Sequence, residues 1–217
     1  MPIRPLVVDI NHADGSREEH GKHVDLIDFH QVRAAGFLAV IHKATEGEHF
    51  VDPLYSERRE KALAAGLQWG AYHFMRPGDV GNQVSAFLKV VRDPRSSVDF
   101  TRYALDYEDE RLGLWQAERW LDLVRTVTGQ TPWLYGGGVL KDKLGTGHAA
   151  ALAQYPLWLS EYGPVAKLPH VWEKYVLWQR SGDGEGPGVH DIPGIGKKQD
   201  INYFDGTDDE LREVWTA

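Results

Sequence analysis

Eight short apolar segments recur along this chain of 217 residues, and their spacing constrains the fold more than any other feature. They begin near residues 6, 38, 68, 103, 132, 157, 175 and 199. The first five begin about 30 residues apart, which leaves room for one strand, one helix and two loops in each interval. The joint Ala34-Ala35-Gly36-Phe37 recurs as Ala64-Ala65-Gly66-Leu67, and each joins a helix end to the next strand through a glycine. This pattern predicts an α/β protein, either a closed barrel of the (β/α)8 type that loses helices late in the chain or an open doubly wound sheet.

The predicted elements follow from apolar periodicity and from the residues that begin and end helices. We expect strands over 6–10, 38–43, 68–74, 102–108, 133–136, 157–161, 175–180 and 199–204. We expect helices over 24–35, 52–65, 80–91, 114–128, part of 139–153, and 208–215, with a polar loop over 11–22. Because no linker interrupts the chain, residues 1–217 are predicted to form a single domain.

Composition excludes several classes of function. The net charge is −8 and no cluster of Lys and Arg occurs, which argues against a nucleic-acid partner. The chain has no cysteine, so disulfides, thiolate metal sites and cysteine nucleophiles are excluded. No apolar stretch approaches 18 residues, so we expect no membrane insertion. The apolar run at residues 6–8 is too short for a signal peptide, so the protein is made in the cytosol or has lost a signal.

The fourth strand carries the strongest candidate for chemistry. Asp106 and Glu108 are two residues apart, so on a strand their side chains point to the same face, with Cα atoms roughly 6–7 Å apart. This lies in the range of the carboxylate pairs that cleave glycosidic bonds. Two acids held close in a partly buried site cannot ionise equally, so one can keep its proton and act as an acid. Asp109 and Glu110 have the simpler explanation that acidic residues favour the start of a helix.

A barrel would gather further polar residues, because the carboxyl ends of its strands meet at one mouth. Asp9 ends the first strand and Asp200 lies on the last, so these two would converge with Asp106 and Glu108 to give four carboxylates. Five other residues at strand ends could bind a substrate or serve the barrel itself; they are Glu46, Tyr72, Phe74, Tyr135 and Trp158. His20 and His23, beside Glu18 and Glu19, fit no metal-binding spacing, so we expect neither a metal nor a cofactor.

Blocks of residues in a fixed order resemble the family-25 glycoside hydrolases, the Chalaropsis-type lysozymes or N-acetylmuramidases. They are Val8-Asp9-Ile10-Asn11-His12; Lys43-Ala44-Thr45-Glu46-Gly47 with Val51-Asp52-Pro53; Ala64-Ala65-Gly66-Leu67 with Gly70-Ala71-Tyr72-His73-Phe74; Leu105-Asp106-Tyr107-Glu108; Pro132-Trp133-Leu134-Tyr135; Leu157-Trp158-Leu159; Tyr162-Gly163; Trp178-Gln179; and Gln199-Asp200-Ile201-Asn202-Tyr203-Phe204. The resemblance covers nearly the whole chain and implies an irregular TIM-like barrel of about (β/α)5(β)3. One departure is His12-Ala13-Asp14-Gly15, which lacks the aromatic residue that the family often has there.

The resemblance also implies an activity, which is hydrolysis of the β-1,4 bond between N-acetylmuramic acid and N-acetylglucosamine in peptidoglycan. Glu108 would be the general acid, and Asp106 would stabilise the developing charge or orient the substrate's 2-acetamido group. Asp9 and Asp200 would line the site. We expect one catalytic barrel over residues 1–217 without a separate wall-binding domain, acting as a monomer on glycan strands, as a phage endolysin or a secreted protein. The alternatives are a barrel that binds peptidoglycan or chitin-like glycan without cutting it, and a hydrolase of another N-acetylhexosamine polymer.

Overall fold

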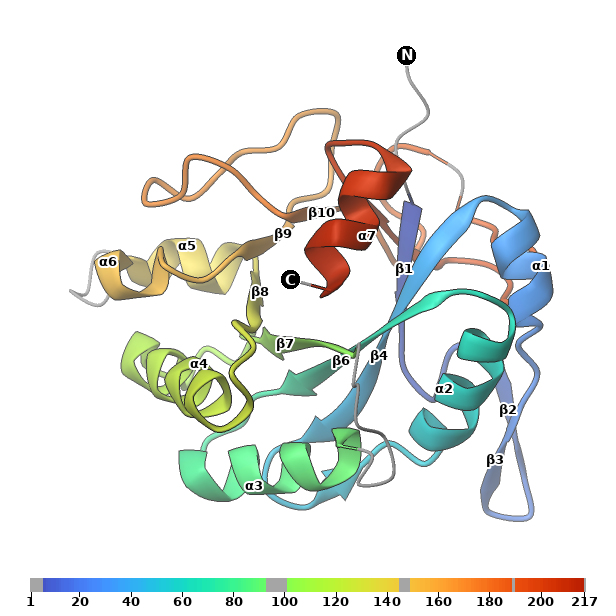
Figure 1. Ribbon diagram of the computed structural model, residues 1–217, viewed down its shortest axis with the longest axis horizontal. Coiled ribbons are helices and arrows are strands. Elements are labelled where there is room, and N and C mark those ends of the chain that lie inside the picture. Colours follow the sequence, from blue (N-terminus) through green and yellow to red (C-terminus); the bar gives the residue numbers. More distant parts are fainter. Residues whose placement is uncertain (1–5, 93–100, 145–148, 189, 217) are drawn as a thin grey trace.

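The computed structural model describes residues 6–92, 101–144, 149–188 and 190–216, and in it eight strands close into a barrel (Figure 1). In chain order the barrel strands are β1 (Leu6–Ile10), β4 (Phe37–Glu46), β6 (Gln68–Phe74), β7 (Arg102–Asp106), β8 (Trp133–Gly136), β9 (Leu157–Ser160), β10 (Leu177–Ser181) and β11 (Asp200–Tyr203). Pairing of β1 with β4 closes the sheet, whose spatial order is β1-β11-β10-β9-β8-β7-β6-β4. All neighbours are parallel except β11, which is antiparallel to β10 and β1. The α/β barrel is therefore confirmed and the open doubly wound sheet is excluded.

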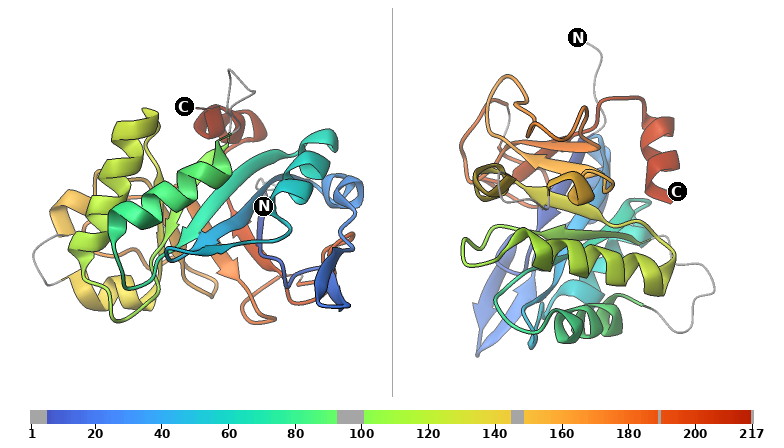
Figure 2. Two further views of the ribbon diagram at one scale, coloured as in Figure 1. Left: turned by 90° about the horizontal axis from the view of Figure 1, so that it is seen from below. Right: turned by 90° about the vertical axis from the view of Figure 1, so that its left-hand side faces the viewer.

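Helices follow each of the first five barrel strands and cover the outside of that part of the barrel (Figure 2). They are α1 (Phe29–Ala34), α2 (Tyr55–Ala64), α3 (Val80–Val91), α4 (Leu114–Thr128), and the short pair α5 (Gly138–Lys143) and α6 (Ala149–Leu152). Within the described residues no helix separates β9, β10 and β11, and α7 (Asp208–Thr216) ends the chain. This is the (β/α)5(β)3 arrangement that the resemblance implied. No helix in the described ranges is long and apolar enough to cross a membrane.

The segment after β1 differs from the prediction of a polar loop and a helix over 24–35. Here β2 (Ser16–Glu19) and β3 (Lys22–Asp25) form an antiparallel hairpin. Its two-residue turn is His20-Gly21, and both residues have positive φ, 52° and 75°, as the tight hairpin turn requires. Helix α1 begins only at Phe29, because the Asp28 side chain accepts hydrogen bonds from the backbone N–H groups of His30 and Gln31.

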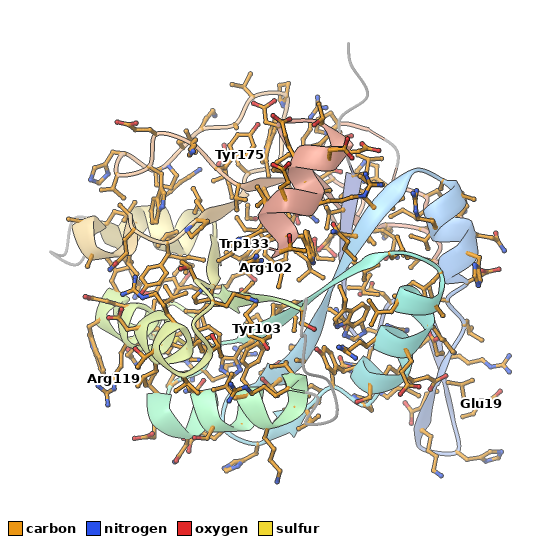
Figure 3. The ribbon with its side chains drawn as sticks, in the orientation of Figure 1. Glu19, Arg102, Tyr103, Arg119, Trp133 and Tyr175 are labelled. Carbon is orange, nitrogen blue, oxygen red and sulfur yellow. The ribbon has the colours of Figure 1, made fainter. Side chains whose placement is uncertain are left out.

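One end of the barrel is closed by α7. The indole N–H of Trp215 donates to the backbone oxygen of Trp69 at 2.8 Å, and its ring lies 5.4 Å from that of Trp133. The buried guanidinium of Arg102 donates to the backbone oxygens of Val214 and Trp215 at 2.8 and 2.7 Å. Figure 3 shows Arg102 and Trp133 beside this helix. Because Trp69, Arg102 and Trp133 stand where β6, β7 and β8 begin, the opposite end, where these strands finish, is left as the mouth.

Candidate active site

The mouth gathers the four carboxylates that the sequence predicted. Asp9 on β1 is the register partner of Asp200 on β11, because the antiparallel β11 begins at the end where β1 finishes. Asp106 is the last residue of β7, and Glu108 follows two residues later. Their charges act on one another, since Glu108 and Asp9 raise the pKa of Asp106 and Glu108 raises that of Asp200. Asp9, Asp106, Glu108 and Asp200 thus form one electrostatic unit.

Strand β7 ends earlier than predicted, at Asp106 instead of Glu108, but the two acids still share a face. The side chain of Tyr107 between them is fully buried in the layer beneath the helices, and its hydroxyl donates to the backbone oxygen of Leu112 at 2.8 Å. The backbone stays extended here, since the N–H of Tyr107 donates to the oxygen of Tyr135 at 3.1 Å. Asp106 and Glu108 therefore both turn away from the helix layer and into the mouth.

The two acids have different surroundings. Asp106 is 6% exposed, and its Oδ1 is buried without a hydrogen-bond partner among the described residues. Burial, and after it the charge of Glu108, raises the pKa of Asp106 well above its ordinary value. Glu108 is reached by solvent, but the protein around its carboxyl and the charge of Asp183 raise its pKa, while Lys43 opposes this. The site therefore raises the pKa of both carboxyls, which is the direction of shift that a general acid requires.

Asp9 and Asp200 are held together by the side-chain amide of Gln179 on β10. Its Nε2 lies 3.2 Å from both oxygens of Asp9 and 3.2 Å from Oδ2 of Asp200. Its Oε1 accepts from the hydroxyls of Tyr135 at 2.8 Å and Ser160 at 3.2 Å, which fixes the orientation of the amide. Burial and the charge of Asp200 raise the pKa of Asp9, and burial raises that of Asp200 to about 7.

A basic pair balances the acids on the β4 and β6 side. Lys43 and Arg76 both form ion pairs with Glu46, the second at 2.7 Å. Although partial burial opposes ionisation of Glu46, the hydrogen bonds from these two residues lower its pKa. The Lys43 ammonium and the Arg76 guanidinium lie 4.7 and 4.3 Å from the ring centroid of Phe74. Glu46 and Phe74 are therefore held by cations at the rim of the mouth.

The remaining predicted residues form an aromatic floor. Tyr72, Tyr135 and Trp158 are 9%, 7% and 2% exposed, and the ring of Trp158 lies 6.4 Å from that of Tyr72 and 4.6 Å from that of Tyr135. The indole N–H of Trp158 donates to Oδ1 of Asn202 at 2.6 Å. Burial raises the pKa of both tyrosines, so their hydroxyls remain protonated donors. These contacts give Trp158 a packing role, and direct contact of the three rings with a substrate remains a prediction.

Several residues of the site had no assigned role in the sequence. Gln179 and Asn202 lay in recognised blocks but were given no function, and Asn202 donates to Oδ1 of Asp9 at 2.6 Å. Asp183 follows β10, and its backbone N–H donates to Oδ1 of Asp200 at 3.1 Å. Asp14 also adds negative charge near Asp9 and Asp200. Gln179 and Asn202 lie on two of the predicted strands, whereas Asp14 and Asp183 follow the ends of strands, and these positions were the only signal that the sequence offered.

His73, near the end of β6, has a structural role. His73 is buried between the hydroxyl of Thr45 and the side chain of Gln83, at 2.8 and 3.0 Å, and burial lowers its pKa to about 4. It is therefore neutral at physiological pH and tied into the wall. Within the ranges that the structure describes, no group of three or more His, Cys, Asp or Glu side chains is arranged to hold a metal ion.

Comparison with known proteins gives one family. The family model for glycosyl hydrolases family 25 matches residues 19–189. The uncharacterized protein YegX of Escherichia coli O157:H7 is 32% identical over 175 residues, which are 78% of this chain and 60% of YegX. The autolytic lysozyme of Clostridium acetobutylicum is 27% identical over 183 residues, 82% of this chain and 52% of that protein. This chain therefore spans less than two thirds of the length of either relative.

A solved structure shares the fold along its whole length. The muramidase from Trichobolus zukalii superposes with a TM-score of 0.76 at 26% sequence identity, covering 98% of this chain and 99% of that one. The barrel described above is therefore the fold of that protein too.

Proposed function

Because the chain belongs to glycosyl hydrolases family 25, we propose that it is a muramidase that hydrolyses the β-1,4 bond between N-acetylmuramic acid and N-acetylglucosamine in bacterial peptidoglycan. The observation that supports this most directly is the pair Asp106 and Glu108, whose pKa values are both raised in one mouth. Paired acids of this kind are the usual means of cleaving a glycosidic bond.

In this proposal Glu108 gives its proton to the glycosidic oxygen. Its access to solvent suits a group that must reach the substrate, and the upward shift of its pKa favours the protonated form that a general acid uses. As the bond between the anomeric carbon and the glycosidic oxygen breaks, positive charge develops on the sugar ring. The second sugar leaves with the glycosidic oxygen as a hydroxyl, which carries the proton of Glu108. Water then completes the hydrolysis, and one of its protons restores Glu108.

Asp106 would bind the 2-acetamido group of the sugar on which the positive charge develops. Its Oδ1 is an acceptor without a partner among the described residues, so an N–H group of the substrate's 2-acetamido substituent would satisfy it. This hydrogen bond would orient the acetamido oxygen toward the anomeric carbon. Asp9 and Asp200, joined through Gln179, would tune the charge of the site and bind sugar hydroxyls.

Side-by-side clearing of purified peptidoglycan tests the proposal, with the wild type, Glu108→Gln and Glu110→Gln. Glutamine keeps the size of the side chain and removes the acid, so Glu108→Gln should lose about 10²-fold or more of the rate. Glu110→Gln is a matched control, because Glu110 is an exposed acid of the same segment. Equal clearing by the wild type and Glu108→Gln would assign the chemistry to another acid.

Two rival functions give different outcomes in this clearing assay and in an analysis of the reducing ends of the products. A glycan-binding barrel would bind the wall without clearing it. A hydrolase of another N-acetylhexosamine polymer would release N-acetylglucosamine ends from a chitin-type substrate, whereas the proposed activity leaves N-acetylmuramic acid at the new reducing ends. The intact set of four carboxylates favours a hydrolase over a barrel that only binds glycan. In this role the protein would act on the bacterial cell wall, as an endolysin or a secreted enzyme.

A further inference from the structure

Strand β5 (Phe50–Val51) continues the barrel wall above the end of β1. Strand β4 pairs with β6 along one edge as far as Glu46. Along its other edge it pairs first with β1, up to His42, and then with β5 at Thr45 and Glu46. Phe50 therefore stands above the end of the strand that carries Asp9.

Phe50 belongs to a cluster of rings from three separate segments. Its centroid lies 5.6 Å from that of His12, which in turn lies 4.6 Å from that of His23 on β3. His12 is fixed by the buried carboxylate of Asp52, which accepts from its backbone N–H at 2.9 Å and lies 3.0 Å from its ring Nδ1. We call Phe50, His12 and His23 the rim platform. Phe50 remains 39% exposed within it.

Lys43 connects the rim platform to the acids. Its ammonium lies 5.7 Å from the ring centroid of Phe50, and the same charge opposes the rise in the pKa of both Asp106 and Glu108. The platform thus borders the mouth, and one cation acts both on its exposed ring and on the carboxyl pair. A single exposed apolar side chain needs no explanation, but a ring held in place by a second ring and a cation at the edge of a polar mouth is preorganised for a flat ligand.

We propose that the rim platform is a binding subsite that stacks against one N-acetylhexosamine ring of the glycan strand, outside the two sugars that flank the cleaved bond. This inference rests on the proposed function. A pyranose has an apolar C–H face that an aromatic ring covers and a polar edge that the neighbouring Asp14 and Lys43 can bind. The subsite lies outside the central pair because β5 pairs with the edge of β4 that faces away from β6 and from β7, the strand that ends at Asp106.

The test measures binding of purified insoluble peptidoglycan by co-sedimentation, in a Glu108→Gln background so that nothing is cut. Phe50→Ala and Phe50→Leu should raise the half-saturating peptidoglycan concentration about 5- to 10-fold, since both remove the ring. Phe50→Trp should keep parental binding. Val51→Ala is the matched control, because Val51 is the neighbouring residue of the same strand and is 48% exposed, and it should stay within about twofold.

Parental binding by Phe50→Leu would overturn the subsite, and so would an equal loss in Val51→Ala. The Leu and Trp variants keep the apolar bulk, so they decide the matter even if Phe50→Ala folds poorly. Failure of the proposed function would look different. In that case the wild type would not clear peptidoglycan, whereas loss of the subsite alone would leave clearing by the wild type intact and Phe50 without effect on binding.

Discussion

Replacing Asp200 by Asn should stabilise the protein at alkaline pH. Burial raises the pKa of Asp200 from 3.8 to about 7. Between these two values the unfolded chain releases the proton of Asp200 while the folded protein keeps it, so the free energy of unfolding falls as the pH rises from about 4 to about 7. Above pH 7 the folded protein and the unfolded chain both carry the ionised carboxylate, so the free energy of unfolding falls no further. An asparagine never ionises and avoids this loss.

The size of the effect follows from the pKa difference. A difference of about three pH units corresponds to about 4 kcal/mol at pH 8, which is a ceiling. Asparagine can still accept the hydrogen bond from the backbone N–H of Asp183, but its amide would face the donor Nε2 of Gln179. We therefore expect a gain of about 2 kcal/mol, or about 4–8 °C in Tm for a chain of this size.

Thermal unfolding at pH 8 and pH 4.5 measures this prediction. Asp200→Asn should unfold at a higher temperature than the wild type at pH 8, and the difference should shrink at pH 4.5. Asp191→Asn makes the same charge change at an exposed position and should leave Tm nearly unchanged at both values. A gain of equal size at both pH values, or no gain at pH 8, would refute the link between burial of Asp200 and stability.

Two further predictions concern the basic residues Lys43 and Arg58. Lys43→Met should move the alkaline limb of the pH–rate profile to higher pH, because the Lys43 charge acts to lower the pKa of Asp106 and Glu108. Lys43→Arg keeps the charge and should leave the limb in place. An unmoved limb in Lys43→Met would contradict this prediction. Arg58→Met should lower the free energy of unfolding in urea by about 3–5 kcal/mol, since this fully buried guanidinium pairs with Asp25 at 2.8 Å and donates to the backbone oxygens of Asn11 and Asp14. The exposed pair of Arg17 and Glu19 offers a control, because Arg17→Met should cost less than about 1 kcal/mol, and an equal loss in both variants would contradict the role of Arg58.

Most strands and helices of the barrel were predictable because the apolar periodicity that indicates them lies within short segments of the sequence. Strands β1, β6 and β8 and helices α3 and α4 have the boundaries that apolar periodicity predicted. The hairpin β2–β3 was missed, because its strands are short and polar and only the turn at His20-Gly21 indicates them. Such a hairpin is stabilised by contacts that a local pattern does not contain, such as the ion pairs of Asp25 with Arg58 and Lys61.

The sequence by itself determined the order of the eight barrel strands and of the helices between them. It also placed Asp9, Asp106, Glu108 and Asp200 at or near strand ends. Both follow from periodicities of two and 3.6 residues within short windows. The tertiary structure alone decided which side chains meet. Gln179 bridges Asp9 and Asp200 only because β11 runs antiparallel between β10 and β1. Phe50 reaches His12 only because β4 is long enough to pair with both β1 and β5. Both contacts depend on how the sheet closes, which is a property of the whole barrel and of no single segment.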